Sequence, residues 1–414
     1  MTVGIEALNV FAGSACIDVG ELARHRQLDA ARFDNLLMKE KTVALPDEDP
    51  VTYAVNAAQP LVEALPAAER NRIELLITCT ESGIDFGKSI STYVHHHLGL
   101  ARNCRLFEIK QACYSGTAGL QMAAAFVLSQ AAPGAKALVV TTDLSRVAIA
   151  PGGEGLSQDW SFAEPSGGAG AVAMLIGEQP AVFELDVGAS GYYGYEVMDT
   201  CRPTPDSEAG NTDLSLMSYL DCCESCFVEY CKRVQDVDYE RSFQQLAFHT
   251  PFGGMVKGAH RTMMRRHAGA SPARIEADFS RRVAPGLTYC QRVGNIMGGT
   301  LYLALASAIE NATLEGTARI GCFSYGSGCC SEFFSGVVTP SSRQVLRRFG
   351  IRAQLERRRR LSIPEYESLL RREFVRFGTR DAAVDDFFVE PVRGVRRLHL
   401  RGVREFHREY GWTP

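Results

Sequence analysis

The stretch "IKQACYSGTAGLQ", residues 109 to 121, places a cysteine between an apolar segment and a run of very small residues. The preceding "CRLFEIKQA" is typical of a strand, and residues 115–131 are typical of a helix. Cys113 would then lie at a helix N-terminus, where unpaired N–H groups and the helix dipole favour a thiolate. The junction therefore predicts a reactive thiol, with a buried structural cysteine as the commoner alternative.

Strand and helix patterns alternate on both sides of this junction. Further helices are expected over 49–65, after residue 249 to about residue 267, and over 299–311. Strands are expected over 72–80, 136–144, 168–177, 181–190, 244–249 and 318–328, the third and fourth of them paired through a turn at Glu178–Pro180. This alternation predicts an α/β fold. We expect an N-terminal half, residues 1–180, and a C-terminal half, residues 181–414.

Polar residues with useful chemistry follow several of the expected strands. Glu81 and His249 each come directly after an apolar strand, Asn295 precedes a helix, and Ser327 lies in a glycine-rich turn. Singly, each has a structural explanation, such as a helix cap, a core histidine or a turn residue. Because open α/β sheets place their sites at strand ends, their presence together with Cys113 favours a reaction site.

The thirteen cysteines raise the question of disulfides or metal. In a long chain without a secretory signal we expect reduced thiols that act as small hydrophobic residues. The densest group lies between residues 222 and 231, where no nearby His or second CxxC motif would complete a zinc site. We interpret it as a helix with a buried stripe, formed by Leu216, Leu220, Cys223, Phe227 and Tyr230.

Charge is distributed unevenly along the 414 residues, whose formal net charge is -4. Residues 341–414 contain 18 Arg against 10 Asp plus Glu, so this tail is basic and the remainder acidic. We interpret the run "LERRRRLSIPEYESLLRREFVRF" as a solvated helical face rather than a nucleic-acid site, because no aromatic stacking platform accompanies it. No apolar run of about eighteen residues is present, and a cytoplasmic location is expected.

Taken together, the motifs resemble those of 3-hydroxy-3-methylglutaryl-CoA synthases of the thiolase superfamily, over nearly the whole chain. They are "TESGIDFGKS", "ACYSGTAGLQ", "GGAGAVAMLI", "FHTPF", "RRVGNI" and "SYGSG". The resemblance implies a duplicated five-layered αβαβα thiolase fold, usually a homodimer, with the site between the halves. It also implies the site residues, with catalytic roles for Glu81, Cys113 and His249 and substrate or oxyanion contacts for Asn295, Tyr325 and Ser327.

The N-terminal segment is most similar to the branch of this family that installs β-branches in polyketides. Enzymes of primary metabolism carry a Tyr where this chain has Val147, and Phe-Trp-Arg-Pro where it has Thr200–Cys201–Arg202–Pro203. These differences imply substrates delivered as phosphopantetheine thioesters on acyl carrier proteins. A primary HMG-CoA synthase that uses acetyl-CoA and acetoacetyl-CoA remains the alternative, and an inactive carrier-binding scaffold is a more distant one.

The resemblance also implies a reaction sequence. Cys113 takes an acetyl group from a donor carrier protein, and Glu81 removes a proton from the acetyl methyl. Backbone N–H groups of Cys113 and Ser327 hold the enolate, which adds to the β-ketone of a polyketide on an acceptor carrier protein. His249, helped by Asn295, polarises that ketone before water releases the product. No metal or redox cofactor is expected.

The helix after His249 predicts a docking surface. Lys257, Arg261 and Arg265 are spaced by four residues and share one face, which suits a pantetheine phosphate and an acidic carrier-protein helix. Arg32 in the N-terminal segment is expected to join them. A merely solvated face is the alternative, and the residues expected to pack inward are Val256, Ala259 and Met263.

Overall fold

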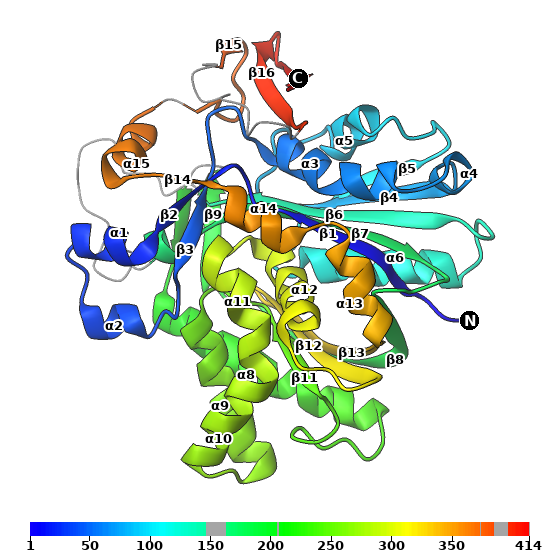
Figure 1. Cartoon of the computed structure of the whole chain (residues 1–414), viewed down its shortest axis with the longest axis vertical. Helices are drawn as coiled ribbons and strands as arrows, with labels where there is room; N and C mark the ends of the chain where they lie inside the picture. Colours follow the sequence, from blue (N-terminus) through cyan, green and yellow to red (C-terminus); the bar gives the residue numbers. More distant parts are fainter. Residues whose placement is uncertain (146–162, 205–206, 373, 385–395, 414) are drawn as a thin grey trace.

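The computed structural model describes residues 1–145, 163–204, 207–372, 374–384 and 396–413. Within them, nine strands form one mixed sheet in the order β11-β12-β13-β8-β1-β7-β6-β4-β5 (Figure 1). In chain order the strands are β1 (Gly4–Phe11), β4 (Ile73–Cys79), β5 (Arg105–Ile109), β6 (Lys136–Leu144), β7 (Ala169–Gly177), β8 (Phe183–Gly194), β11 (Gln245–Phe248), β12 (Ala318–Gly326) and β13 (Cys330–Val338). The two halves of the sheet meet where Gly4 and Ile5 of β1 pair with Glu184 and Phe183 of β8.

Helices cover the outer faces of both halves and fill the space between them (Figure 1). On the first half, α3 (Pro50–Glu63) packs against β1, β6 and β7, while α6 (Ser115–Leu128) packs against β4 and β6. On the second half, α12 (Thr300–Asn311) contacts β11 and β12, and α8 (Thr212–Arg233) contacts β8 and β13. The resulting order of layers, αβαβα, is the thiolase-like fold that the resemblance implies.

Strand β6 illustrates why the strands of the first half are apolar throughout. All nine of its residues are buried, because helices cover both of its faces. Leu138 and Val140 pack in the hydrophobic cluster on the α3 side, and Val139 packs in the cluster on the α6 side. Period-two alternation of side chains thus sends successive apolar residues into two different cores.

The small residues of α6 allow the close packing that the sequence predicts. A Cβ atom on Gly116 would lie 2.3 Å from the backbone oxygen of Gly298, and one on Gly119 would lie 2.6 Å from Cys79 Sγ. Neither position can hold a larger residue without displacing its neighbours. The glycines therefore let the helix that follows Cys113 lie against β4 on one side and the Gly298 segment, which leads into α12, on the other.

Most of the predicted strands and helices are present, but one predicted pairing is wrong. β7 and β8 are sequential in the chain, yet they do not pair, because β1 lies between them and β8 pairs with β13. The N-terminal strand β1 was not among the strands predicted from the sequence. The division of the chain at residue 180 stays a prediction.

The cysteine-rich helix is α8, and its buried side is close to the predicted stripe. Cys223, Phe227 and Tyr230 are buried in an aromatic cluster, together with Cys222 and Cys226. Leu220 is only partly buried, and Leu216 is exposed because the first turns of the helix extend beyond the sheet it covers. The stripe prediction is therefore correct for the C-terminal turns of the helix and wrong at its start.

Most of the arginine-rich run is solvated, as the sequence predicts, since Arg357, Arg359 and Arg360 are exposed, but other arginines of the tail are buried. Arg358 lies between α14 (Ile351–Arg357) and α15 (Ile363–Leu370), is buried, and donates to Glu40 Oε2 at 3.0 Å. Later in the tail, buried Arg397 and Arg408 pair at 2.9 Å with carboxylates of the N-terminal half, Asp47 and Asp49. Several of these arginines therefore fasten the tail to the N-terminal half. None of the described helices is both long enough and apolar enough to cross a membrane.

Candidate active site

One cavity of about 670 Å³ collects six of the predicted site residues. They come from both halves of the sheet: from the segments that follow β4 and β5 in the first half, and from the segments after β11, before α12 and at the end of β12 in the second. Strand ends from the two halves thus converge on a single cavity, as the strand-end argument predicts. The six are Glu81, Cys113, His249, Asn295, Tyr325 and Ser327.

Cys113 lies at a sharp turn between β5 and α6. Ala112, immediately before it, has φ +42°, a left-handed conformation that is costly for a residue with a Cβ atom. The thiol lies 3.4 Å from Glu81 and donates to its Oε1. Burial raises the pKa of the Cys113 thiol well above its usual value, and the negative charge of Glu81 raises it further. The predicted lowering of this pKa by the helix N-terminus is therefore wrong.

Two opposing influences act on the pKa of Glu81: burial disfavours its charged form, and a nearby arginine favours that form. Burial raises the pKa of the carboxyl, and Arg202, whose Nε lies 3.8 Å from Glu81 Oε2, opposes that rise. Arg202 also donates to Ser82 Oγ at 3.2 Å and to Glu208 Oε1 at 2.7 Å. These contacts fix the guanidinium beside Glu81, where its positive charge limits the rise in the pKa of the carboxyl that burial causes.

Asp143 supports the Glu81 segment from the end of β6. Its Oδ1 accepts hydrogen bonds from the backbone N–H groups of Glu81 at 2.8 Å and Ser82 at 3.1 Å, and from the Thr80 hydroxyl at 3.1 Å. Burial and the nearby charge of Glu81 raise the pKa of Asp143 to about 7. Sequence reasoning missed this residue, although its position at the end of a predicted strand was a usable signal.

His249 follows β11 and is buried at the cavity wall. Its backbone N–H donates to the Phe323 oxygen at 2.7 Å, and its carbonyl accepts from the Tyr219 hydroxyl at 2.6 Å. Burial lowers the pKa of the imidazole to about 3, so the ring is neutral near pH 7. Within the described part of the chain, no group forms a hydrogen bond with its Nδ1. A neutral imidazole of this kind can donate to, or accept from, a bound substrate.

Asn295, Tyr325 and Ser327 occupy fixed positions on the second-half side of the cavity. Asn295 Oδ1 accepts from the backbone N–H of Met297 and from the Thr300 hydroxyl, both at 3.0 Å, so its NH₂ group is the part left to donate. Tyr325 donates to Asp199 at 2.6 Å. The hydroxyls of Ser327 and Thr200 lie 2.6 Å apart.

The predicted docking residues lie outside this cavity. Lys257, Arg261 and Arg265 are on α9 (Gly253–Ala268), where Lys257 pairs with Glu276 at 2.9 Å and the two arginines are exposed. The predicted inward side is correct, since Val256, Ala259 and Met263 are buried.

Arg32 is exposed on a neighbouring segment, in α2 (Ala30–Asp34). The chain just after α2 contacts the start of α9, where Gly254 N donates to the Leu36 oxygen at 3.3 Å. The N-terminal segment therefore lies next to the first turn of the helix that carries Arg261 and Arg265. Val147, one of the positions expected to distinguish this chain from enzymes of primary metabolism, falls outside the described residues.

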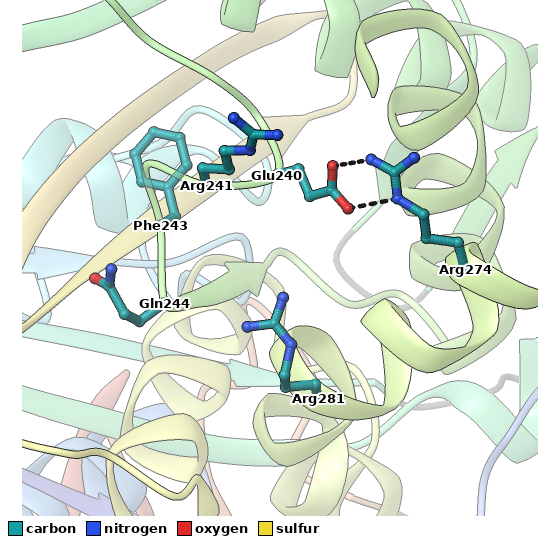
Figure 2. Close-up of a pocket in the computed structure, with 6 residues that line it drawn as sticks. All are labelled: Glu240, Arg241, Phe243, Gln244, Arg274 and Arg281. Carbon is teal, nitrogen blue, oxygen red and sulfur yellow. Dashed lines mark hydrogen bonds and ion pairs between the residues drawn. The ribbon is translucent and has the colours of Figure 1, made fainter. Parts of the chain in front are cut away.

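A separate surface cavity of about 390 Å³ lies at the opposite end of β11 from His249. Figure 2 shows three arginines around it, with Arg274 forming a bidentate pair with Glu240, while Phe243 and Gln244 complete the wall. It contains none of the predicted catalytic residues and no cysteine or histidine. The chemistry is therefore assigned to the larger cavity that holds Cys113.

Comparisons with known proteins show the family of this chain. Residues 1–181 match the family described as hydroxymethylglutaryl-coenzyme A synthase N terminal, and residues 270–385 match its C-terminal counterpart. The polyketide biosynthesis 3-hydroxy-3-methylglutaryl-ACP synthase PksG of Bacillus subtilis is 64% identical, over 100% of this chain and 99% of that protein. Hydroxymethylglutaryl-CoA synthase of Enterococcus faecalis is 34% identical over 89% of this chain and 91% of that protein.

Solved structures give the same result. The curacin biosynthetic pathway HMG synthase, in complex with holo donor-ACP, has a TM-score of 0.95 and 61% identity, and the match covers 100% of both chains. Similarity of sequence and fold thus extends along the full length of the protein. The chain therefore belongs to the hydroxymethylglutaryl-coenzyme A synthase family.

Proposed function

We propose that this protein condenses an acetyl group from a donor acyl carrier protein with the β-ketone of a polyketide on an acceptor carrier protein. The product is a β-branched, 3-hydroxy-3-methylglutaryl-type thioester. The observation that carries the proposal is the contact between the Cys113 thiol and Glu81 in a cavity that also contains His249. A nucleophile, a base and a neutral imidazole around one cavity are the groups this reaction needs.

The first step is acylation of the thiol. Cys113 Sγ attacks the thioester carbonyl carbon of the donor and forms a new C–S bond to it. The bond from that carbon to the pantetheine sulfur breaks, and the pantetheine leaves as a thiol. The thiol proton ends on the leaving pantetheine sulfur, so the Glu81 carboxylate beside Cys113 remains free to act as the base of the next step. The result is an acetyl-enzyme and a free donor carrier protein.

The second step forms the carbon–carbon bond. Glu81 removes a proton from the acetyl methyl group, and backbone N–H groups of Cys113 and Ser327 stabilise the enolate oxygen. The carbanion adds to the β-ketone of the acceptor, whose oxygen then takes up the proton that Glu81 removed. His249 polarises this ketone by donating a hydrogen bond to its oxygen, with the Asn295 amide beside it. A neutral imidazole can do this without a charge that burial would penalise. Water then hydrolyses the thioester to Cys113.

The choice of carrier proteins over coenzyme A is supported by the comparisons. The relative at 64% identity is named an HMG-ACP synthase, and the curacin synthase was solved with a donor carrier protein. The alternative, a primary HMG-CoA synthase, is represented by a relative at 34% identity. The direct test is to offer acetyl-carrier protein and acetyl-CoA side by side and to follow acetyl-Cys113 by intact mass. Faster acylation by acetyl-CoA would contradict the proposal.

Docking of the donor on the basic face of α9 gives a second prediction. Arg265→Glu should slow acetyl transfer from the carrier protein, most strongly at low salt, because reversing one exposed charge mainly affects encounter. Transfer from a small acetyl-pantetheine mimic should stay nearly unchanged. Arg241→Glu, which makes the same charge change at the separate cavity of Figure 2, is the matched control and should leave both donors unaffected. An equal loss with both donors for Arg265→Glu would remove the docking role.

The arginine beside Glu81 gives a prediction about pH. The groups that face Glu81 are Arg202, Cys113, Glu208 and Asp143, and of these Arg202 alone favours the carboxylate by its charge. Arg202→Gln should raise the pKa of Glu81 further, so the base is protonated over more of the pH range. The acid limb of the pH profile for condensation should then shift to higher pH, with a several-fold loss near pH 7 that recovers at higher pH.

Arg202→Lys provides the control for this experiment because it keeps the positive charge. It should keep the limb near its original position even if the maximal rate falls through imperfect geometry. If Arg202→Gln lowers the rate equally at all pH values, the arginine supports only the local structure.

We also propose that the enzyme is a homodimer in the cytoplasm. β5 forms an open edge of the sheet, and an edge strand is a ready template for pairing with a second copy of the same chain. All thirteen cysteines are free thiols, as suits a reducing compartment. The mass of the particle in solution checks the dimer, and a monomer would contradict it.

A further inference from the structure

Asn295 needs a fixed position, because its amide has to reach the oxygen of the acceptor ketone in the proposed reaction. It lies in the loop between α11 (Ala284–Val293) and α12, outside both helices. Its Oδ1 is bound by Met297 and Thr300, which follow it closely in the chain. Those contacts orient the side chain within its own loop, but they do not place the loop at the cavity. A displacement of about 1 Å can slow a reaction by about 10²-fold, so the placement of this loop matters.

A single helical turn, α7 (Ala163–Ser166), places the loop. The backbone N–H of Asn295 donates to the Ser166 oxygen at 2.8 Å, and its carbonyl accepts from the N–H of Gly168 at 2.9 Å. Gly168 lies directly against the loop, since a Cβ atom there would come within 2.2 Å of the Val293 oxygen. The position of Asn295 therefore depends on α7 and on the glycines after it. A turn of this length has little stability of its own, so other contacts must hold it.

The side chain of Glu164, in α7, is bound by an arginine and a tyrosine. Arg26, which follows α1 (Val19–His25), donates from Nε and Nη2 to the two carboxylate oxygens at 2.8 Å and 2.9 Å, and Tyr366 of α15 donates to Oε1 at 3.1 Å. Burial by itself would raise the pKa of Glu164, but the hydrogen bond from Arg26 helps to outweigh burial and the pKa lies below its usual value. The carboxylate is therefore charged, and a bidentate pair fixes the direction of both side chains.

The backbone of Glu164 is bound as well. The ammonium group of Lys41, a buried residue of β3 (Glu40–Val43), donates to the Glu164 oxygen. Arg26 also pairs with Glu367 of α15 at 2.5 Å, so its guanidinium is held from a second side. Helix α1 contacts both α7 and α15, and Figure 1 shows α1 and α15 on the same side of the molecule. The N-terminal segment and the tail thus hold α7 together, and they do so through Glu164.

We propose that Glu164 is a positioning residue for carbon–carbon bond formation: paired with Arg26, it holds α7, and α7 holds Asn295 at the cavity. This inference rests on the proposed function, in which Asn295 helps to polarise the acceptor ketone. Glu164 is not among the described residues that line the reaction cavity, so it acts through Asn295 and not on the substrate. Acetylation of Cys113 does not use Asn295. The two half-reactions should therefore respond differently to the loss of Glu164.

Glu164→Gln removes the charge of the side chain and keeps its shape. Acetyl-Cys113 should form from acetyl-carrier protein at the wild-type rate. When the preformed acetyl-enzyme is mixed with acetoacetyl-carrier protein, single-turnover condensation should be slower by about tenfold, because Asn295 is no longer held in one position. Arg26→Gln removes the other half of the pair and should give the same split between the half-reactions. Intact-mass measurement follows both steps.

A double variant tests the route through Asn295. Asn295→Ala sets the loss of condensation that results when the amide is absent. If Glu164 acts by placing this amide, Glu164→Gln combined with Asn295→Ala should condense no more slowly than Asn295→Ala alone, since residues that act as a unit are not additive. A further loss of about tenfold in the double variant would show that Glu164 acts by another route, and the inference would fall.

Asp47→Asn is the matched control for stability. Asp47 is buried and pairs with buried Arg397 at 2.9 Å, so this change also weakens a buried arginine–carboxylate pair. Like Glu164→Gln, it should lower the temperature of thermal unfolding. It should leave both half-reactions unchanged, because its pair joins the tail to the N-terminal half and does not hold α7. Equally slow condensation in Asp47→Asn would mean that lost stability alone produces the effect.

The outcomes separate this inference from the proposed function. If the wild-type protein forms no acetyl-Cys113 or condenses no carrier-bound acceptor, the proposed function fails. If Asn295→Ala condenses at the wild-type rate, the role of Asn295 in that function is wrong and this inference falls with it. If Asn295→Ala slows condensation, but Glu164→Gln slows neither half-reaction or slows both equally, the function stands and Glu164 is not the residue that positions Asn295.

Discussion

Cys113→Ala is expected to form no acetyl-enzyme and to release no condensed product. Removing the nucleophile of a covalent mechanism costs on the order of 10⁶ in kcat, because the other groups of the site act only through the covalent intermediate. The fold should persist, since alanine removes one sulfur atom from a position bordered by an open cavity. Intact-mass measurement after incubation with the acetyl donor reads the acetyl-enzyme directly, and circular dichroism checks the fold.

Cys201→Ala is the matched control for this experiment. Cys201 lines the same cavity as Cys113 and is also partly exposed, so reagents and substrates that reach one thiol can reach the other. The thiol that donates to Glu81 is that of Cys113, so replacement of Cys201 should leave acetylation and turnover unchanged. If the Cys113→Ala protein still becomes acetylated while Cys201→Ala does not, the nucleophile has been assigned to the wrong thiol.

Glu81→Gln should separate the two halves of the reaction. Glutamine cannot accept the methyl proton, so carbon–carbon bond formation should fall by about 10²- to 10⁴-fold, the range expected for loss of a general base. Acetylation should continue, because the neutral amide removes the negative charge that helps to raise the pKa of the Cys113 thiol. Acetyl-enzyme is therefore expected to accumulate, and exchange of its methyl protons with deuterated solvent should be lost.

Glu108→Gln makes the same chemical change at another carboxyl that lines the cavity. Glu108 accepts a hydrogen bond from the backbone N–H of Ile90 at 2.9 Å, and glutamine retains that acceptor. Its turnover should stay within about threefold of wild type, as for a substitution away from the reacting atoms. Methyl-proton exchange in Glu81→Gln at a rate within tenfold of wild type would show that another group is the base.

Much of the site follows from local sequence. A strand followed by Cys113 and a glycine-rich helix can form only if small residues allow the helix to approach its neighbours, and Gly116 and Gly119 meet that condition. The other site residues, such as Glu81 and His249, lie at strand ends, and the geometry of an α/β sheet gathers such ends together. Position along the chain was therefore enough to nominate residues that line one cavity.

The electrostatics of the site could not be predicted in the same way. The helix N-terminus suggested a thiolate, but burial and the facing carboxylate of Glu81 outweigh the helix dipole and raise the thiol pKa. The opposing charge comes from Arg202, which is more than a hundred residues away in the chain. A pKa depends on which groups surround an atom in three dimensions, and the sequence does not give those distances.

By itself, then, the sequence determined the kinds of element, their order and the residues able to do chemistry, because periodicity and turn residues act over a few neighbours. Only the tertiary structure decided that β1 lies between β7 and β8, since strand order reflects which faces can be buried together. It also decided that tail arginines such as Arg397 are buried against carboxylates such as Asp47. Long-range pairing and burial arise from the folded chain as a whole, and no local pattern contains them.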